Sequence, residues 1–162
     1  QKILAINFSS VFYGCKHSIP YLKKNNGGSI INIASVQAHT PLPGWAAYAG
    51  IKGGVISMTR NIASEFGPFN IRVNSISPAA IATPIFYGGS ERANTLSDEE
   101  NQRKMKKLES NLAKAVPLGR SGYPRDVAEG ALYLASDAGQ FVTSHDLIID
   151  AGRSSMFYEP NA

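Results

Sequence analysis

A tyrosine and a lysine stand four positions apart in the stretch "YAGIK", residues 48 to 52. On a helix, positions i and i+4 share one face, so Tyr48 and Lys52 could point into the same pocket. Free tyrosine ionises near pH 10, and supplying its anion at pH 7 costs about 4 kcal/mol. A nearby ammonium lowers that cost because it favours the anion. The pair therefore fits a general acid and base, Tyr48, that is activated by Lys52.

The spacing alone also fits a structural interpretation, in which a buried tyrosine lies beside a lysine whose aliphatic stem covers apolar surface. The helices and strands predicted around Tyr48 and Lys52 therefore help to distinguish the two interpretations. Residues 3–23 carry apolar side chains three and four apart, the period of a helix with one buried face. The run "SIINIA", residues 29–34, predicts a buried parallel strand because it is mostly apolar and β-branched. Residues 45–66 predict a second helix, which carries the pair, and residues 71–77 predict a second strand.

The rest of the chain continues this alternation. A loop over residues 77–84 is followed by a variable stretch and then by Ser97, which forms a capping box with Glu100 at the start of a charged amphipathic helix. Pro124 begins another helix, and "DLIID", residues 146–150, predicts a last strand. Alternating helices and strands imply an α/β domain with a parallel sheet, and no boundary to a second domain is evident.

Composition narrows the possible functions. Much of the net charge of +4 lies in "RKMKK", residues 103–107, which follows the acidic "SDEE" as on a solvated helix face, so we expect no nucleic-acid partner. The single cysteine, Cys15, cannot form a multi-thiolate site, and no metal-ligand spacing occurs, so we expect no metal. No apolar run approaches the roughly 20 residues that span a bilayer, and no signal-peptide pattern opens the sequence. We therefore expect a cytoplasmic protein without a membrane partner.

Four ordered runs carry a resemblance to a known family. The chain closely resembles the short-chain dehydrogenase/reductase family in "GGSIINIASVQAHTPLPGWAAYAGIKGGVISMTRNIASEF", "IRVNSISPAAIATP", "VPLGRSGYPRDVAEGALYLASD" and "VTSHDLIIDAG". The resemblance covers nearly all of residues 1–162, apart from the stretch between Phe86 and Ala115. It implies a Rossmann-like doubly wound parallel sheet. It also implies an enzyme that uses NAD or NADP to interconvert a small-molecule secondary alcohol and a ketone by hydride transfer.

The resemblance assigns catalytic roles to four residues. The family's serine falls on Ser35, thirteen residues before Tyr48, and its hydroxyl would orient the reacting substrate oxygen toward Tyr48. The family's asparagine falls on Asn7 in the first predicted helix, where it would hold a water that connects Lys52 to solvent. The catalytic set implied by the resemblance is thus Asn7, Ser35, Tyr48 and Lys52.

The loop after the second predicted strand resembles the family's segment along the nicotinamide end of the dinucleotide. The matching positions, with Ala79 where the family usually has glycine, are Pro78, Ala79, Ile81 and Thr83. The backbone of Ile81 would contact the carboxamide, and Lys52 would reach the ribose hydroxyls beside Tyr48. Ser144 likewise stands where glycine is usual, which predicts a minor backbone adjustment.

Substrate contacts are predicted on the loop after Ser35 and beyond the cofactor loop. The candidates are Gln37, His39, Trp45, Phe86 and Tyr87. Their apolar members indicate a secondary alcohol or ketone on a hydrophobic, cyclic body. For His39 a surface role remains the alternative. The stretch 86–115 with its capped helix fits a substrate lid.

Neither GxxxGxG nor GxGxxG, the phosphate-binding turns, occurs in the sequence. We therefore interpret the chain as the C-terminal half of the family's domain, inactive by itself and with an unpaired edge on its first strand. We expect the complete protein to be a homodimer or homotetramer. Two alternatives stay open: a non-catalytic remnant that acts as a pairing module, and a relative of the sugar-nucleotide epimerases, which use tyrosine and lysine at the same spacing.

Overall fold

The computed structural model describes residues 1–156. These residues divide into two compact units. The first comprises residues 1–78 and 128–148, and the second comprises residues 79–127 and the segment from Ile149 onward. None of the helices within residues 1–156 is both long enough and apolar enough to cross a membrane.

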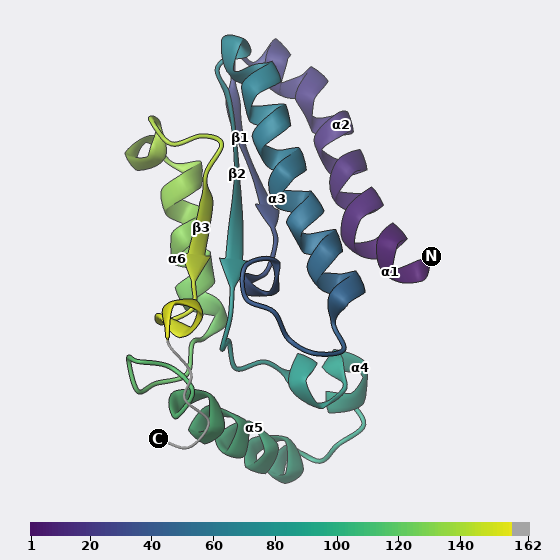
Figure 1. The fold of residues 1–162 in the computed structure, drawn as a ribbon, viewed down its shortest axis with the longest axis vertical. Coiled ribbons are helices and arrows are strands. Elements are labelled where there is room, and N and C mark those ends of the chain that lie inside the picture. The colour runs from purple at the N-terminus through teal and green to yellow at the C-terminus, as the bar shows by residue number, and fades with distance from the viewer. Residues whose placement is uncertain (157–162) are drawn as a thin grey trace. The chain divides into compact units, whose positions relative to one another are not determined.

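The first unit is built on a three-stranded sheet with the order β1 (Gly28–Ile33), β2 (Ile71–Pro78) and β3 (Asp146–Ile149). Strands β1 and β2 run parallel, with Gly28 opposite Ile71 and Ile33 opposite Ile76. All three strands point the same way in Figure 1. The predicted α/β fold with a parallel sheet is therefore confirmed.

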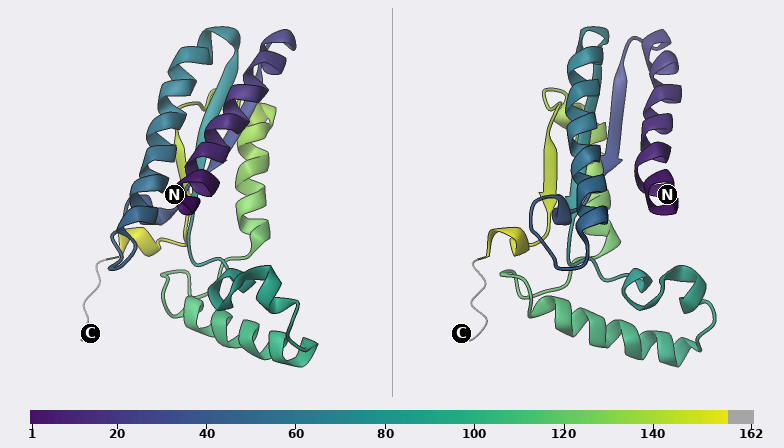
Figure 2. Two further views of the ribbon diagram at one scale, coloured as in Figure 1. Left: turned by 90° about the vertical axis from the view of Figure 1, so that its right-hand side faces the viewer. Right: turned by 45° about the vertical axis from the view of Figure 1, so that its right-hand side comes forward.

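Helices cover both faces of this sheet (Figures 1 and 2). Helices α2 (Ser10–Lys24) and α3 (Ala46–Phe66) lie on one face, and α6 (Pro124–Ala135) lies on the other. The buried residues between α2, α3 and β2 are Cys15, Ile19, Ala63, Ile71 and Val73. Cys15 and Ile19 come from the predicted apolar face of the first helix, so the periodicity of residues 3–23 is confirmed there, whereas Leu4 and Phe12 of the same face are exposed.

The first predicted helix is not one continuous α-helix. It begins as α1 (Lys2–Leu4), passes through a π-helical turn over Ala5–Ser9 and continues as α2. Two polar side chains compete for the backbone carbonyls of this turn. Asn7 Nδ2 donates to the Ile3 carbonyl at 3.2 Å, and Ser10 Oγ donates to the Ile6 carbonyl at 2.5 Å. Such bonds offer the backbone an alternative to the regular ladder, but the bond from Ser18 Oγ to the Gly14 carbonyl is of the same type and lies within regular α2, so these bonds accompany the π turn without explaining it.

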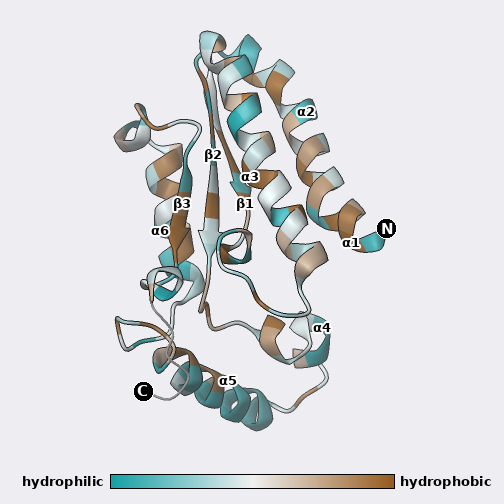
Figure 3. Cartoon of the chain, viewed as in Figure 1, coloured by the Kyte–Doolittle hydropathy of each residue, from teal (hydrophilic) through white to brown (hydrophobic). Residues whose placement is uncertain are grey.

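The second unit contains a 3₁₀ turn over Pro84–Tyr87, α4 (Gly89–Ala93) and α5 (Asp98–Ala113). The predicted cap is confirmed, since Ser97 Oγ accepts a hydrogen bond from the Glu100 N–H at 3.2 Å. Hydrophilic residues dominate most of α5 (Figure 3). Its apolar stripe packs on a small cluster of buried residues, which are Ala80, Ala82, Leu112 and Val116. The short helix α4 was not predicted, because its five residues, "GSERA", carry no helical period.

A candidate active site at the carboxyl end of β1

Ser35 lies just beyond the end of β1. The strand pairing continues through the Ala34 N–H, which donates to the Ile76 carbonyl at 2.7 Å. Ser35 itself is extended and caps a 3₁₀ turn over Val36–Ala38, in which its Oγ accepts the Gln37 N–H at 3.2 Å. The side chain is buried, so its position is fixed by the sheet on one side and by the turn on the other. The carboxyl end of a parallel strand is where open α/β sheets bind ligands.

Helix α3 presents Tyr48 in its first turn and Lys52 in its second. Tyr48 is half-buried, and its ring packs edge-on against Trp45 with 5.8 Å between the ring centroids. Lys52 Nζ lies 5.7 Å from the centroid of the Tyr48 ring. The shared helix face that the spacing predicted is therefore present.

Lys52 is tied to the strand that carries Ser35. Its Nζ donates to the Ile33 carbonyl at 2.8 Å, and the residue is only 7% exposed. This burial lowers the pKa of the Lys52 ammonium, because desolvation disfavours the charged form. The bond joins α3 to the last residue of β1, two positions before Ser35, so three of the four predicted catalytic residues belong to one end of the sheet.

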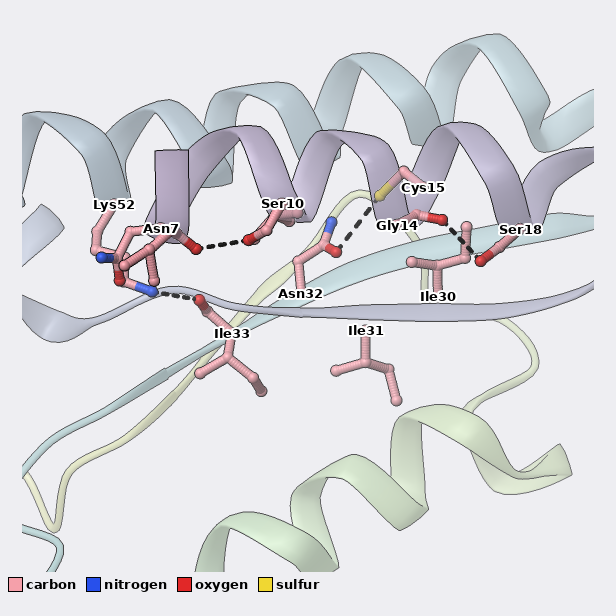
Figure 4. Close-up of a pocket in the computed structure, with 12 residues that line it drawn as sticks. Asn7, Ser10, Gly14, Cys15, Ser18, Ile30, Ile31, Asn32, Ile33 and Lys52 are labelled. Atoms are coloured by element: carbon pink, nitrogen blue, oxygen red, sulfur yellow. Dashed lines mark hydrogen bonds between the residues drawn. The ribbon is translucent and has the colours of Figure 1, made fainter. Parts of the chain in front are cut away.

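Asn7 and Lys52 line a common groove of about 460 Å³ between α2 and β1. Figure 4 shows both side chains at the same end of this groove, with the bond from Lys52 to Ile33 as a dashed line. The groove runs along the edge of β1, which pairs only with β2 among the strands of residues 1–156. The π-helical turn carries Asn7, so an irregular piece of helix presents the fourth predicted catalytic residue.

The predicted substrate residues of the first unit have different surroundings. Trp45 is 49% exposed. The Gln37 Oε1 atom is buried and accepts no hydrogen bond from residues 1–156. His39 is engaged within the protein, since its Nε2 lies 2.7 Å from Asp146 Oδ2. Sequence reasoning missed Asp146, although an acidic residue that opens a buried strand is itself a signal.

The predicted cofactor loop leaves the end of β2 at Pro78. The Ala79 N–H donates to the Ile149 carbonyl at 3.0 Å, and Ile81 forms a parallel bridge with Gly122. The left-handed backbone, with φ of 56°, falls on Ala80 rather than on Ala79, the position where glycine was expected. Thr83 is extended before the turn that contains Phe86, which is 55% exposed, and Tyr87.

No cluster of three or more histidine, cysteine, aspartate or glutamate side chains suited to a metal ion occurs in the part of the chain that the structure describes.

Comparisons with known proteins show what the chain as a whole is similar to. The family model described as "Enoyl-(Acyl carrier protein) reductase" matches residues 1–154. The 3-oxoacyl-[acyl-carrier-protein] reductase FabG of Chlamydia pneumoniae is 36% identical over 152 residues, which are 94% of this chain and 55% of that protein. The 2,5-dichloro-2,5-cyclohexadiene-1,4-diol dehydrogenase LinX of Sphingobium indicum is 39% identical over 95% of this chain and 56% of that protein. The chain thus spans about half the length of the curated relatives it matches.

Two solved structures share the fold. The structure titled levodione reductase has a TM-score of 0.78 and 32% identity, and the match covers 96% of this chain and 58% of that one. A 3-ketoacyl-(acyl-carrier-protein) reductase from Brucella melitensis, solved in complex with NADH, has a TM-score of 0.77 and 30% identity over 94% of this chain and 57% of that one.

Proposed function

The chain belongs to the short-chain dehydrogenase/reductase family, and on that premise we propose that the native protein is an NAD- or NADP-dependent oxidoreductase that interconverts a secondary alcohol and a ketone. The observation that carries the proposal is the bond between Lys52 and Ile33, because it brings the ammonium and the tyrosine of α3 to the strand end that bears Ser35.

The residues present fit a nicotinamide dinucleotide. An ammonium has three donors, and Lys52 uses one of them on the Ile33 carbonyl, which leaves two for a pair of ribose hydroxyls. The loop residues Pro78, Ala79, Ile81 and Thr83 would hold the nicotinamide end. The bound cofactor would supply or accept the hydride.

Ser35 is suited to orient the substrate oxygen. Its Oγ accepts the Gln37 N–H, so the hydroxyl proton is left to donate to a second oxygen. In the proposed reaction that acceptor is the alcohol or carbonyl oxygen of the substrate. The Ser35 proton would then stabilise negative charge that develops on this oxygen.

Tyr48 exchanges a proton with the same oxygen. In the direction of oxidation its phenolate takes the hydroxyl proton, and in the direction of reduction its hydroxyl returns one. Lys52, whose Nζ lies 5.7 Å from the centroid of the Tyr48 ring, is proposed to assist this proton transfer with its positive charge. Asn7, which lines the same groove as Lys52, would hold a water that carries protons between the lysine and solvent.

The substrate is proposed to be a hydroxyl or keto group on an apolar ring. Trp45 in the first unit would supply apolar surface, as would Phe86 and Tyr87 in the second, and Gln37 would supply a polar contact through its Oε1, which accepts no hydrogen bond from residues 1–156. Relatives named cyclopentanol dehydrogenase, from Comamonas testosteroni, and 3beta-hydroxysteroid dehydrogenase 1, from Eggerthella lenta, are 35% and 37% identical to this chain. Both names describe secondary alcohols on rings, which supports the proposed class.

The test is a spectrophotometric assay of the native protein with NAD and NADP against matched cyclic secondary alcohols, linear secondary alcohols and a 3-ketoacyl thioester. Turnover of cyclic alcohols with one of the two cofactors supports the proposal. Preference for the thioester would assign the acyl-reductase activity that the names of other relatives describe. Absence of turnover with every substrate under conditions where the protein binds the cofactor would refute the oxidoreductase assignment.

A further inference from the structure

Asp146 opens β3 with a carboxylate whose side chain is only 4% exposed. Three donors satisfy it. Ser75 Oγ donates to Oδ1 at 2.5 Å, Ser77 Oγ donates to Oδ2 at 2.8 Å, and His39 Nε2 lies 2.7 Å from Oδ2. A buried carboxylate is stable only when such hydrogen bonds replace those it made to water. The cluster is therefore complete within the first unit.

The three donors are not equivalent. Ser75 and Ser77 stand two positions apart on β2, so both point to the same face of the sheet, and both are fully buried. They would hold the carboxylate without help from any loop. His39 instead comes from the segment after Ser35, and its side chain is 32% exposed. The contact between His39 and Asp146 thus connects the segment after β1 to the first residue of β3.

The segment between Ser35 and His39 is a compact turn held by local hydrogen bonds. The Ala38 N–H donates to the Ser35 carbonyl at 3.0 Å, and the His39 N–H donates to the Val36 carbonyl at 2.9 Å. One end is anchored where Ala34 pairs with Ile76. Toward its other end Ala38 packs against the buried cluster that includes Val55 and Ile56, and the contact of His39 with Asp146 is the side-chain bond that ties this end to β3 before the exposed loop around Leu42. The turn is thus clamped at both ends.

From this geometry we infer that His39 is a positioning residue, which fixes the turn that carries Ser35 and Gln37 by bonding to the Asp146 anchor. The inference rests on the proposed function for its catalytic consequence. His39 does not touch the reacting atoms in this assignment, and its ring acts through the backbone of residues 35–39. A shift of about 1 Å in a catalytic group can cost on the order of 100-fold in rate, so a clamp on Ser35 has a measurable effect.

The experiment compares three variants of the native protein. His39→Ala removes the clamp, and His39→Gln keeps an N–H donor at nearly the reach of Nε2. His17→Ala is the matched control, because His17 is an exposed histidine on α2 outside the cluster. For each variant, amide hydrogen exchange in residues 35–40, kcat, KM and the dissociation constant of the cofactor are measured, together with the unfolding midpoint to confirm folding.

In His39→Ala we expect the amides of residues 35–40 to exchange at least tenfold faster than in the parent. We expect kcat to fall at least tenfold, while the dissociation constant of the cofactor stays within twofold of the parent value. His39→Gln should recover most of both losses, and His17→Ala should behave as the parent. Unchanged exchange in His39→Ala would overturn the clamp, and faster exchange with unchanged kcat would overturn its role in positioning Ser35. If the parent has no oxidoreductase activity, the proposed function fails and the catalytic part of the inference fails with it, whereas the exchange data still decide whether the clamp exists.

Discussion

The Nζ atom of Lys52 lies 2.8 Å from the carbonyl oxygen of Ile33. This contact couples two requirements of the proposed chemistry. It orients a buried cation relative to the end of β1, and it satisfies one donor of an ammonium whose pKa burial lowers. The lysine is therefore held in place by the backbone of the strand, with its Nζ 5.7 Å from the centroid of the Tyr48 ring.

Replacement of Tyr48 by phenylalanine tests the acid and base. The variant keeps the ring that packs against Trp45 and loses only the oxygen that exchanges the proton. We expect kcat of the native protein to fall by about 10²- to 10⁴-fold, with little change in cofactor affinity. Tyr13→Phe is the control, because Tyr13 is 53% exposed on α2. A Tyr48→Phe variant that retains kcat within tenfold of the parent would exclude this role.

Replacement of Lys52 by methionine should affect both cofactor and chemistry. The ammonium is proposed to bind the ribose and to favour the tyrosinate, so the variant should bind the cofactor more weakly. In addition, the pH at which oxidation reaches half its maximum should move upward, because the base loses its stabilising charge. Titration calorimetry and a pH profile of the chemical step measure the two effects, with Lys16→Met, an exposed lysine on α2, as control. An unmoved midpoint would show that the lysine is not the activator.

An ion pair at the start of α6 predicts a specific sensitivity to acid. The hydrogen bond from Arg120 and that from the Tyr123 N–H lower the pKa of Asp126 to about 2. A carboxyl whose pKa is lower in the folded state stabilises the fold above its ordinary pKa near 4, and this stabilisation is lost as the pH falls toward 2. The pair is exposed, so solvent screens it and its contribution to stability is small.

Arg120→Gln should therefore be less stable than the parent at pH 6, and this difference should shrink as the pH falls from about 4 to about 2. Urea unfolding at several pH values measures it. Arg60→Gln on the exposed face of α3 is the control. A difference between Arg120→Gln and the parent that stays constant over this range would contradict the assignment of the pKa shift to the ion pair.

Ser144 adopts the left-handed backbone conformation that glycine adopts more easily than other residues. Its φ is 63°, and its N–H donates to the Val73 carbonyl at 2.9 Å, so the predicted backbone adjustment does not remove the left-handed conformation. Such a conformation costs a non-glycine residue about 1–2 kcal/mol. Ser144→Gly should therefore raise the free energy of unfolding by about 1 kcal/mol, as measured by urea titration. Ser136→Gly, at a φ of −86°, should give no such gain; equal effects in both variants would refute the strain argument.

The predicted lid gives a test by ligand binding. The segment from Phe86 to Leu112 contacts the small cluster of the second unit through one apolar stripe and is otherwise hydrophilic along α5. Segments with few buried contacts open easily, so its amides should exchange quickly in the free protein. Exchange should slow when cofactor and substrate bind together. Equal protection in both states would make the segment a static cover.

The sequence predicted those parts of the fold that depend on local pattern. The apolar periodicity around Cys15 and Ile19 and the β-branched run in β1 determined the helix and the strand, because burial on one face or on two faces leaves a direct trace in residue types. The π-helical turn leaves no such trace. It is accompanied by hydrogen bonds from Asn7 and Ser10 to carbonyls four positions earlier, and a hydropathy pattern does not record such bonds.

The candidate site was predictable to a similar extent. Helical spacing predicted that Tyr48 and Lys52 share one face of α3, and the resemblance assigned Ser35 a position that the structure has just beyond the end of β1. The contact of His39 with Asp146 joins residues 107 positions apart. It depends on the order of the strands, so no local pattern could reveal it, and the histidine was therefore assigned to substrate or surface rather than to an anchor.

The π-helical turn at Ala5–Ser9 has a consequence for insertions and deletions. Each residue advances an α-helix by about 100°, and a π turn accommodates one additional residue without displacing the helix that follows. Deletion of one residue within the turn would restore a regular ladder and rotate Asn7 away from the groove while α2 keeps its register on the sheet. A change in chain length, rather than a side-chain substitution, could thus disconnect Asn7 from Lys52 and leave the core intact.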